Sequence, residues 1–207
     1  MSLPPSLRSA LQRVFRGILA EHRGAWEGAL SGCAPLVASL GNVAQQMLAL
    51  RKAVALGLLG SSSLGAFPDL PRRLSQKHRG AAEALLAQLR QEKLPELQKV
   101  RDAAAVHVAE VCLLCDGQLD ALGLEASFQR SPLCPSLADM MEWLLDIQAF
   151  YQRTYLEAKL LLLQVRYENL EEIQALPKAW EQVMQRGLQS PVEDALLKVS
   201  FFLEEAA

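Results

Sequence analysis

The chain has 207 residues, 51% of them hydrophobic and 21% charged, which suits one ordinary globular domain or two very small ones. A chain of this length can bury a sizeable core without disulfides or structural metals. Aromatic residues make up only 6%, while leucine, alanine, glutamine and glutamate are abundant, so helices are favoured over a β-sandwich.

The net charge of −2 conceals an uneven distribution. Residues 1–101 hold 14 Lys and Arg against 6 Asp and Glu, a balance of +8, and residues 102–207 hold 7 against 17, a balance of −10. The split can reflect basic helix faces paired with acidic ones inside one bundle. It can also reflect a basic surface for nucleic acid or ribosomal material and an acidic surface for a protein partner. The interleaved aromatic and basic residues that single-strand binding uses are missing, which favours internal pairing.

Apolar residues recur at spacings of three and four along nearly the whole chain, which predicts helices throughout. The first helix is expected over residues 6–29, ending near Gly32, and the second from Pro35 to about Leu56, with the proline at a first-turn position. The stretch "GLLGSSSLGAFPDLP" then interrupts the pattern and predicts a flexible Gly/Ser loop near residues 57–66.

A third helix is expected over residues 70–92, and Pro95 either begins a fourth that reaches about Leu122 or kinks one long helix. After a loop, Ser136 precedes Asp139 by three residues, an N-cap arrangement that predicts a fifth helix from there to about Arg166. At 1.5 Å per residue that helix would be roughly 45 Å long.

The C-terminal quarter contains shorter elements. Asn169 followed by Glu172 predicts another helix start, and Pro177 predicts a break or kink in that helix. The stretch "SPVE", from Ser190 to Glu193, predicts the start of the last helix. The expected fold is all-α: a single helical-bundle domain over residues 1–207, made of long antiparallel helices with shorter C-terminal helices.

The cysteines and the N-terminal residues indicate the cellular compartment in which the protein is expected. Four cysteines without a secretory hydrophobic region indicate a reducing compartment, and no run approaches the roughly 18 apolar residues of a membrane-spanning helix. The arginines of the first 20 residues superficially resemble a transit peptide. The apolar stripe there continues toward Trp26, however, so we favour a mature amphipathic helix.

The pair Cys112 and Cys115 has the spacing of zinc and dithiol sites. A closed zinc site needs four ligands, and the sequence offers no second pair at that spacing. Two small side chains packed on one helical face are the favoured interpretation, and a metal or redox protein is the alternative.

Nothing in the sequence indicates catalysis. The three histidines lie far apart, no nucleophile, metalloprotease or phosphate-loop motif is present, and the paired carboxylates lie at expected helix starts or at the terminus. We therefore expect a non-enzymatic protein with no cofactor, no metal and no small-molecule substrate.

The basic run "PRRLSQKHRG" is the strongest indication of nucleic-acid binding. A basic patch of Arg72, Arg73, Lys77 and Arg79 would make the chain an RNA- or DNA-binding helical module. The simpler interpretation is a solvated helix face.

The expected fifth helix carries an unusually wide apolar surface. A surface helix needs an apolar stripe of only about 100°, and this helix exceeds it. Core packing explains the excess, and so does a partner-binding face, because methionines and aromatics are enriched at protein interfaces. The candidate partner-facing residues are Met140, Trp143, Ile147, Phe150, Tyr151 and Tyr155, followed by Trp180, Phe201 and Phe202.

Three stretches in order, "SLADMMEWLLDIQAFYQRTYL", "IQALPKAW" and "VSFFLEE", resemble the AIRIM family of ribosome maturation factors, and "FPDL" and "KVRD" are similar as well. The likeness runs from about residue 25 to the end and does not include the cysteine pair.

The resemblance implies a non-catalytic adaptor subunit that works with SPATA-type AAA+ ATPases and with CINP, the cyclin-dependent-kinase-interacting protein. It implies a role in late maturation of the large (60S) ribosomal subunit, where a shuttling assembly factor is released, and in turnover of replication proteins on chromatin. Contact with pre-60S particles would be indirect, no membrane would be involved, and the expected localisation is nucleus and cytoplasm.

Overall fold

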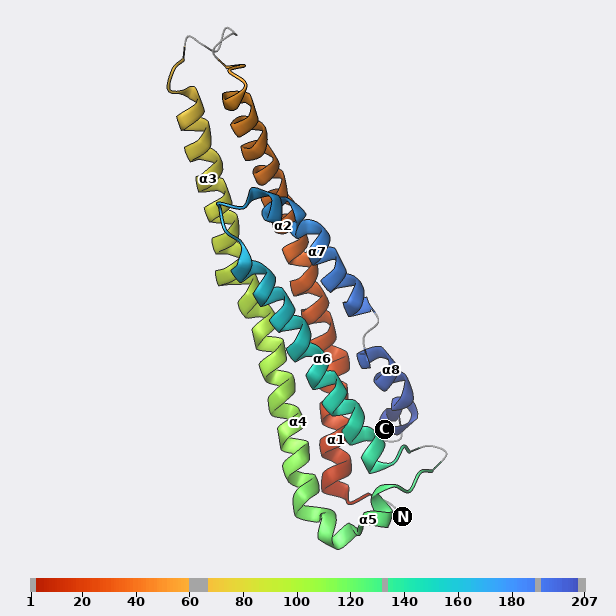
Figure 1. The fold of residues 1–207 in the computed structure, drawn as a ribbon. Helices are drawn as coiled ribbons and strands as arrows, with labels where there is room; N and C mark the ends of the chain where they lie inside the picture. Colours follow the sequence, from red (N-terminus) through yellow and green to blue (C-terminus); the bar gives the residue numbers. More distant parts are fainter. Residues whose placement is uncertain (1–2, 60–66, 132–133, 189–190, 205–207) are drawn as a thin grey trace. The chain divides into compact units, whose positions relative to one another are not determined.

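A computed structural model describes residues 3–59, 67–131, 134–188 and 191–204 (Figure 1). Every regular element in these residues is a helix, which confirms the all-α prediction. The elements in chain order are α1 (Pro5–Gly17), η1 (Ile18–His22), α2 (Arg23–Ala55), α3 (Leu70–Gln88), η3 (Leu89–Lys93), α4 (Leu94–Leu122), α5 (Leu124–Ser127), α6 (Leu137–Gln164), α7 (Leu170–Leu188), α8 (Pro191–Lys198) and α9 (Ser200–Glu204).

The chain divides into two compact units. Unit 1 consists of Met1–Gly28, Glu96–Leu156 and Arg186–Ala207, and unit 2 of Ala29–Pro95 and Glu157–Gln185. Each unit is therefore assembled from segments distant in sequence. That the whole chain forms one domain stays a prediction.

Unit 1 packs α1 antiparallel to α4. Near the start of α1, the Ser6 hydroxyl accepts a hydrogen bond from Gln118 at the end of α4, and farther along Arg13 pairs with Glu110. The helix α6 in turn runs antiparallel to α4, because Tyr155 contacts Gln98. The N-terminal stripe is buried in this core, as a mature amphipathic helix requires: Leu7, Leu11, Val14 and Ile18.

Unit 2 pairs α2 with α3 and η3, which lie side by side in Figure 1. Lys93 reaches Gly32, and the end of α2 faces the start of α3, so these two helices are also antiparallel. The backbone of α7 comes closest at Gly41, where an added Cβ would lie 2.8 Å from Cγ of Pro177. Arg90 donates a hydrogen bond to the Leu162 carbonyl of α6 and ties that helix to η3.

Three prolines were expected to begin, break or kink helices, and the chain stays helical through all of them. Pro35 and Pro177 lie inside α2 and α7, so the predicted helix boundary at Pro35 is wrong. Pro95 lies one residue into α4, directly after the wider π-helical turn η3, in which the Leu94 amide donates to the Leu89 carbonyl. The continuous-helix alternative for Pro95 is therefore correct, and the wide turn accommodates a residue that has no amide to donate.

A second π-helical turn, η1, lies between α1 and α2, where the Arg23 amide donates to the Ile18 carbonyl. The buried residues around it, Val14, Ile18, His22 and Trp26, follow one another at steps of four. Three such steps span twelve residues, whereas three turns of a regular α-helix take about eleven. In a regular helix, the stripe would therefore rotate out of the core. The wider turn absorbs that residue and keeps the stripe facing inward.

The helix α2 ends in a Schellman motif. The Leu58 amide donates to the Ala53 carbonyl and the Gly57 amide to the Val54 carbonyl, and Gly57 has a φ of 66°. This left-handed conformation suits glycine, so the sequence signal at the end of the helix is correct. The rest of the predicted Gly/Ser loop, residues 60–66, lies outside the described residues.

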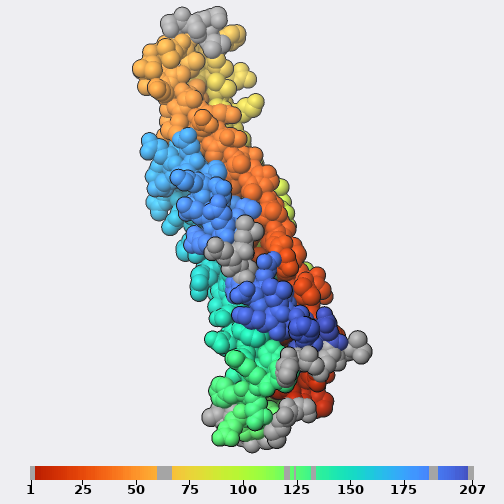
Figure 2. All heavy atoms as spheres, turned by 90° about the vertical axis from the view of Figure 1, so that its right-hand side faces the viewer, coloured from red at the N-terminus to blue at the C-terminus, as the bar shows by residue number. Residues whose placement is uncertain are grey.

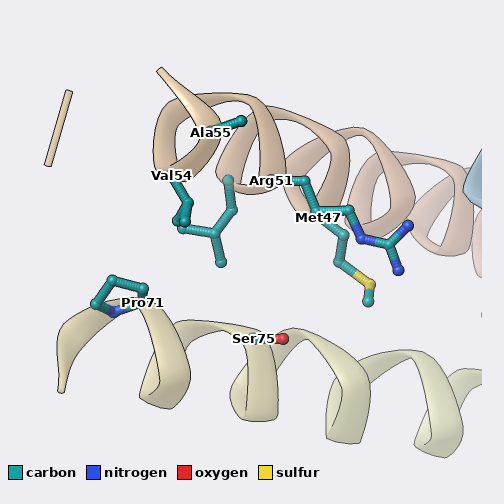
Figure 3. Close-up of a pocket in the computed structure, with 7 residues that line it drawn as sticks. Met47, Arg51, Val54, Ala55, Pro71 and Ser75 are labelled. Carbon is teal, nitrogen blue, oxygen red and sulfur yellow. The ribbon is translucent and has the colours of Figure 1, made fainter. Parts of the chain in front are cut away.

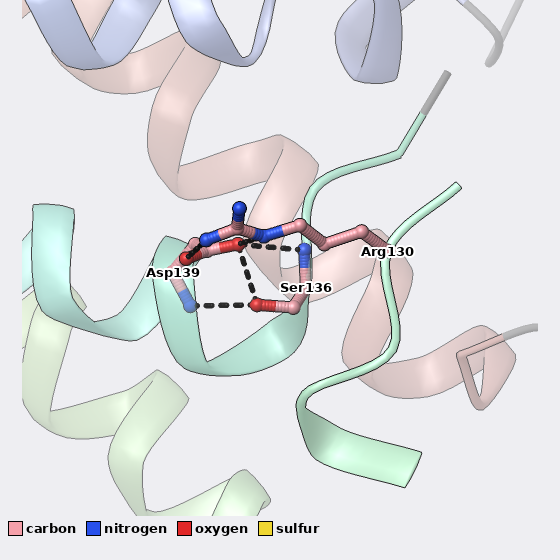
Figure 4. Close-up of polar contacts among 3 residues, drawn as sticks. All are labelled: Arg130, Ser136 and Asp139. Carbon is pink, nitrogen blue, oxygen red and sulfur yellow. Dashed lines mark hydrogen bonds and ion pairs between the residues drawn. The ribbon is translucent and has the colours of Figure 1, made fainter. Parts of the chain in front are cut away.

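Helix starts follow the predicted caps. The Ser136 hydroxyl accepts a hydrogen bond from the Asp139 amide at 3.1 Å, and the Asp139 carboxylate accepts one from the Ser136 amide at 3.2 Å (Figure 4). The Asn169 side chain accepts a bond from the Glu172 amide at 3.4 Å. The predicted cap at Ser190 lies outside the described residues, although α8 begins at Pro191 as expected.

The continuous helix Pro5–Ala55 also has the length and composition of a membrane-spanning segment, since one 18-residue window has a mean hydropathy of 1.2. The core helix of a soluble protein passes the same test. Within unit 2 its buried residues recur at helical spacing, as a core helix requires: Cys33, Val37, Leu40, Ala44 and Met47. The apolar window is 33% buried, and the part of the helix in unit 2 packs against the core of that unit.

Candidate functional site

Most of the predicted partner-facing residues are buried in the two units. Six of the nine are at most 2% exposed: Met140, Ile147, Tyr151, Tyr155, Trp180 and Phe202. The prediction assumed that these side chains were exposed, and their burial corrects that assumption. Four of them lie on α6, whose wide apolar face is covered by other helices of the chain, and Trp180 and Phe202 are buried on α7 and α9. Which residues a partner contacts stays a prediction.

Tyr151 shows what covers that face in unit 1. Its ring lies 4.8 Å from the ring of Trp26 and 5.5 Å from that of Phe150, in tilted arrangements that aromatic pairs prefer. Burial raises the pKa of the Tyr151 hydroxyl far above its usual value. Trp26 and Tyr151 therefore belong to the buried core of unit 1, and the aromatic contacts stabilise it.

Tyr155 is held by polar contacts as well. Its hydroxyl donates a hydrogen bond to Oε1 of Gln98 at 3.0 Å, and the Arg101 guanidinium lies 4.2 Å from the ring centroid. Both partners belong to α4, so this residue fixes α6 against α4.

Three predicted residues retain exposed surface. Trp143 and Phe150 are partly exposed, and Lys198 of α8 lies 5.3 Å above the Trp143 ring. Phe201 is 62% exposed, which is unusual for so large an apolar side chain. The accessible part of the predicted surface therefore centres on the C-terminal helices.

An apolar groove in unit 1 is formed in part by α9, the helix that carries Phe201. This C-terminal groove has a volume of about 530 Å³ and runs between η1 and the helices α8 and α9, which cover the N-terminal helix in Figure 2. Leu19 and Leu197, at 48% and 74% exposed, are its most accessible apolar residues. The lining residues are Leu19, Arg23, Glu193, Leu196, Leu197, Ser200, Leu203 and Glu204.

Two hydrogen bonds from α1, one of them buried, fix the C-terminal end of the helices that form this groove. Gln12, which is 7% exposed, donates to the Phe202 carbonyl at 2.9 Å, and Arg16 donates to the Leu203 carbonyl at 2.6 Å. Arg23 and Glu193 form an ion pair of 3.0 Å across its wall. The groove is thus a shaped feature of the unit and suits an apolar side chain from a protein partner.

Leu19 and Leu197 were missed by the sequence reasoning. A signal for Leu197 was present, because adjacent leucines on one short helix cannot both face the same core, and Leu196 is the buried member of the pair. Leu19 carried no comparable signal, since its position depends on the π-helical turn.

The predicted basic patch lies on α3 in unit 2, with all four side chains exposed. Arg79 pairs with Glu83 at 3.0 Å and lies 5.7 Å from the Tyr167 ring, while Arg72 approaches Asp69 at 3.9 Å. Arg73 and Lys77 make no ion pair with any described residue.

The cysteine pair has a packing environment. Cys115 is buried with its Sγ 3.5 Å from Sδ of Met141, and burial raises the pKa of its thiol to about 11. A thiol that stays protonated at neutral pH is a poor metal ligand and nucleophile. In the described part of the chain, no three His, Cys, Asp or Glu side chains gather closely enough to hold a metal ion.

The α6 cap is tied to the preceding loop by a residue that was not predicted. Arg130 donates two hydrogen bonds to the Asp139 carboxylate, at 2.7 and 2.6 Å (Figure 4). These bonds, with those from Ser136, lower the pKa of Asp139 to about 2.

The described residues of the two units thus define an all-helical protein with exposed apolar and charged surfaces. The sequence model of the family "Ribosome biogenesis protein C1orf109-like" matches residues 5–201, so the chain belongs to this family.

Curated relatives extend over almost the whole chain. A human protein named "AFG2-interacting ribosome maturation factor" is 41% identical over 200 residues, which cover 97% of this chain and 96% of the relative. Relatives of the same name from Mus musculus and Xenopus tropicalis are 38% and 39% identical over 199 residues each. They cover 96% and 95% of this chain, and 89% and 94% of their own lengths. The resemblance found in the sequence is confirmed.

Proposed function

We propose that the chain is a non-catalytic adaptor that interacts with an AFG2-type AAA+ ATPase in ribosome maturation. The observation that carries this proposal is the near-complete coverage, at 41% identity, of a human protein named for that interaction. The exposed apolar groove supports a binding role.

In the finer form of the proposal, the adaptor positions a SPATA-type ATPase on late pre-60S particles, together with CINP, so that a shuttling assembly factor is released. The same assembly turns over replication proteins on chromatin, and the chain is present in nucleus and cytoplasm. The C-terminal groove of unit 1 is the surface that receives the partner, because it presents exposed Leu19 and Leu197 on a fixed helical frame. Exposed Phe201 lies on α9, the helix that supplies Ser200 and Leu203 to the groove.

Affinity purification of the tagged full chain, read by mass spectrometry, tests the function. We expect the ATPase and large-subunit precursors to co-purify with the natural chain. If neither is recovered, the adaptor proposal is wrong.

A pair of variants tests the surface. Leu197→Ser with Phe201→Ser should abolish recovery of the ATPase while leaving the melting temperature nearly unchanged, because both side chains are exposed. Leu113→Ser is the matched control, since Leu113 lies on α4 of the same unit and is 73% exposed. Equal losses in both would show that the groove is not the binding surface.

A further inference from the structure

A second apolar groove lies in unit 2, where the end of α2 faces the start of α3 (Figure 3). Met47, Leu50 and Val54 follow one another at steps of three and four, so they line one face of α2. Opposite them α3 presents Pro71 and Ser75, whose small side chains leave a space of about 280 Å³. We name this feature the α2–α3 groove.

Additional apolar side chains are exposed at the same ends of the two helices. Val54 is 49% exposed within the groove, and Leu56 and Leu58, just beyond the end of α2, are 61% and 55% exposed. The Schellman motif fixes the backbone of Leu58, so these leucines are presented on an ordered turn. Phe67, three residues before α3, is 63% exposed.

The charge around the α2–α3 groove is strongly positive. Residues 47–80 hold six Lys and Arg and one acid, Asp69, a balance of +5. Four of these cations make no ion pair within the described ranges: Arg51, Lys52, Arg73 and Lys77. Arg51 lines the groove itself. Uncompensated charge of one sign around an apolar floor is complementary to an acidic ligand with an apolar face.

We propose that the α2–α3 groove binds an acidic amphipathic helix of a protein partner. The apolar floor from Met47 to Val54 spans about 10 Å, or two helical turns, which matches the spacing of anchors on a helix laid into a groove. Carboxylates flanking those anchors would reach Arg51, Arg73 and Lys77. The inference stands on this surface alone and does not rest on the proposed function.

The other ligand classes fit less well. A volume of 280 Å³ is below the range of about 300–1,000 Å³ typical of small-molecule sites. Single-stranded nucleic acid would need aromatic stacking platforms, and Phe67 is the single aromatic residue in residues 47–80.

Binding of defined probes to the full chain tests the proposal. The probes are a labelled acidic peptide of four helical turns with leucines at steps of three and four, the same composition scrambled so that no apolar face forms, and a single-stranded RNA of 20 nucleotides. In fluorescence anisotropy we expect the amphipathic peptide to bind on the order of tenfold more tightly than the scrambled one, and more tightly than the RNA.

Two variants locate the binding. Ser75→Trp should fill the groove and weaken the amphipathic peptide about tenfold, whereas Ser39→Trp, exposed elsewhere on α2, should not. Arg73→Glu with Lys77→Glu should weaken binding and reduce its salt dependence, whereas Arg166→Glu with Lys178→Glu, exposed elsewhere in unit 2, should have a much smaller effect. Melting temperatures establish that each variant is folded.

Equal affinity for the two peptides would overturn the proposal, because it would show attraction by charge alone. Tighter binding of RNA, unaffected by Ser75→Trp, would overturn it in favour of nucleic acid. Failure of the amphipathic peptide to bind would overturn it as well. None of these outcomes depends on whether the ATPase co-purifies, so the two proposals can fail separately.

Discussion

In unit 1, cations of the N-terminal half meet carboxylates of the C-terminal half, as in the pairs Arg13–Glu110 and Arg23–Glu193. At the α2–α3 groove of unit 2, by contrast, Arg73 and Lys77 face no carboxylate among the described residues. The uneven charge of the sequence thus has two origins, internal pairing in one unit and a basic surface in the other. Internal pairing is thus observed in unit 1, and whether the basic surface of unit 2 binds nucleic acid, ribosomal material or a protein stays a prediction.

The apolar residues differ in the same way. The wide stripe of α6 in unit 1 is covered by aromatic neighbours, whereas Val54 and the leucines after it in unit 2 are exposed. Apolar width alone therefore does not identify a binding face. Apolar surface that remains exposed beside uncompensated charge is the better indicator.

The largest expected effect concerns the buried aromatic residues of unit 1. Tyr151→Ala should lower the free energy of unfolding by about 3–5 kcal/mol, because it removes a buried ring from an aromatic cluster. Val54→Ala, at the exposed groove of unit 2, should cost only about 0.5 kcal/mol. Urea denaturation measures both, and similar costs would show that the two surfaces are equally buried in solution.

Gly41 tests whether unit 2 is tightly packed away from its groove. Gly41→Ala should destabilise the protein by about 1–3 kcal/mol, because the new Cβ would meet Cγ of Pro177 at 2.8 Å. Gly80→Ala, on α3 with nothing within 4 Å of its added Cβ, should stabilise by about 0.5–1 kcal/mol. Thermal denaturation distinguishes the two, and a neutral Gly41 variant would mean that α2 and α7 are not in contact.

Acid should weaken unit 1 through His22, which stacks on His107 with ring centroids 5.2 Å apart. Burial, with a smaller contribution from His107, lowers the pKa of His22 below 6.5, while Glu21 opposes this shift. The unfolded chain therefore binds a proton that the folded chain does not, so stability is full above pH 6.5 and falls as the pH drops through the folded pKa. Unfolding free energies at pH 7.5 and 5.5 should differ less in His22→Gln than in the natural chain; an unchanged difference would contradict this.

The smallest expected effect contrasts a paired cation with an unpaired one. Arg130→Ala should lower the free energy of unfolding only slightly at pH 7, because Arg130 is mostly exposed and supports the α6 cap. Its contribution is present above the usual Asp pKa of about 3.8 and is lost as the pH falls toward the folded value of about 2. Arg73→Ala should leave the unfolding free energy unchanged at every pH. A loss equal to that of Arg130→Ala would place an unrecognised ion pair at the α2–α3 groove.

Local signals predicted the starts and ends of several helices. Two helix caps form between residues only three apart, Ser136 with Asp139 and Asn169 with Glu172. The left-handed conformation of Gly57 is possible because glycine has no side chain. These features depend on neighbouring residues alone, so they can be predicted from the sequence. The helix boundary at Pro35 was misjudged because a helix fixed by packing on both sides of a proline tolerates the lost hydrogen bond, and α7 likewise continues through Pro177 without a break.

Which residues contact a partner could not be predicted from the sequence as well as the helix ends could. Helical spacing shows that a face of α6 is apolar, but whether that face meets Trp26 or solvent depends on segments far away in sequence. Arg130 was missed for a related reason, because its role depends on a loop conformation that returns it to Asp139. Phe201 was identified by size alone, and its neighbour Leu197 needed the structure.

The π-helical turn η1 has a consequence for insertions and deletions. Because this turn accommodates one residue more than a regular helix would, deleting a single exposed residue there, such as Ala20, would convert it to an ordinary α-helical turn. Val14 and Trp26 would keep their places in the core. Deletion of one residue from the middle of α1 would instead rotate everything before it by about 100° and expose the apolar stripe. Chain length can therefore vary by one residue at η1 at little cost to the fold.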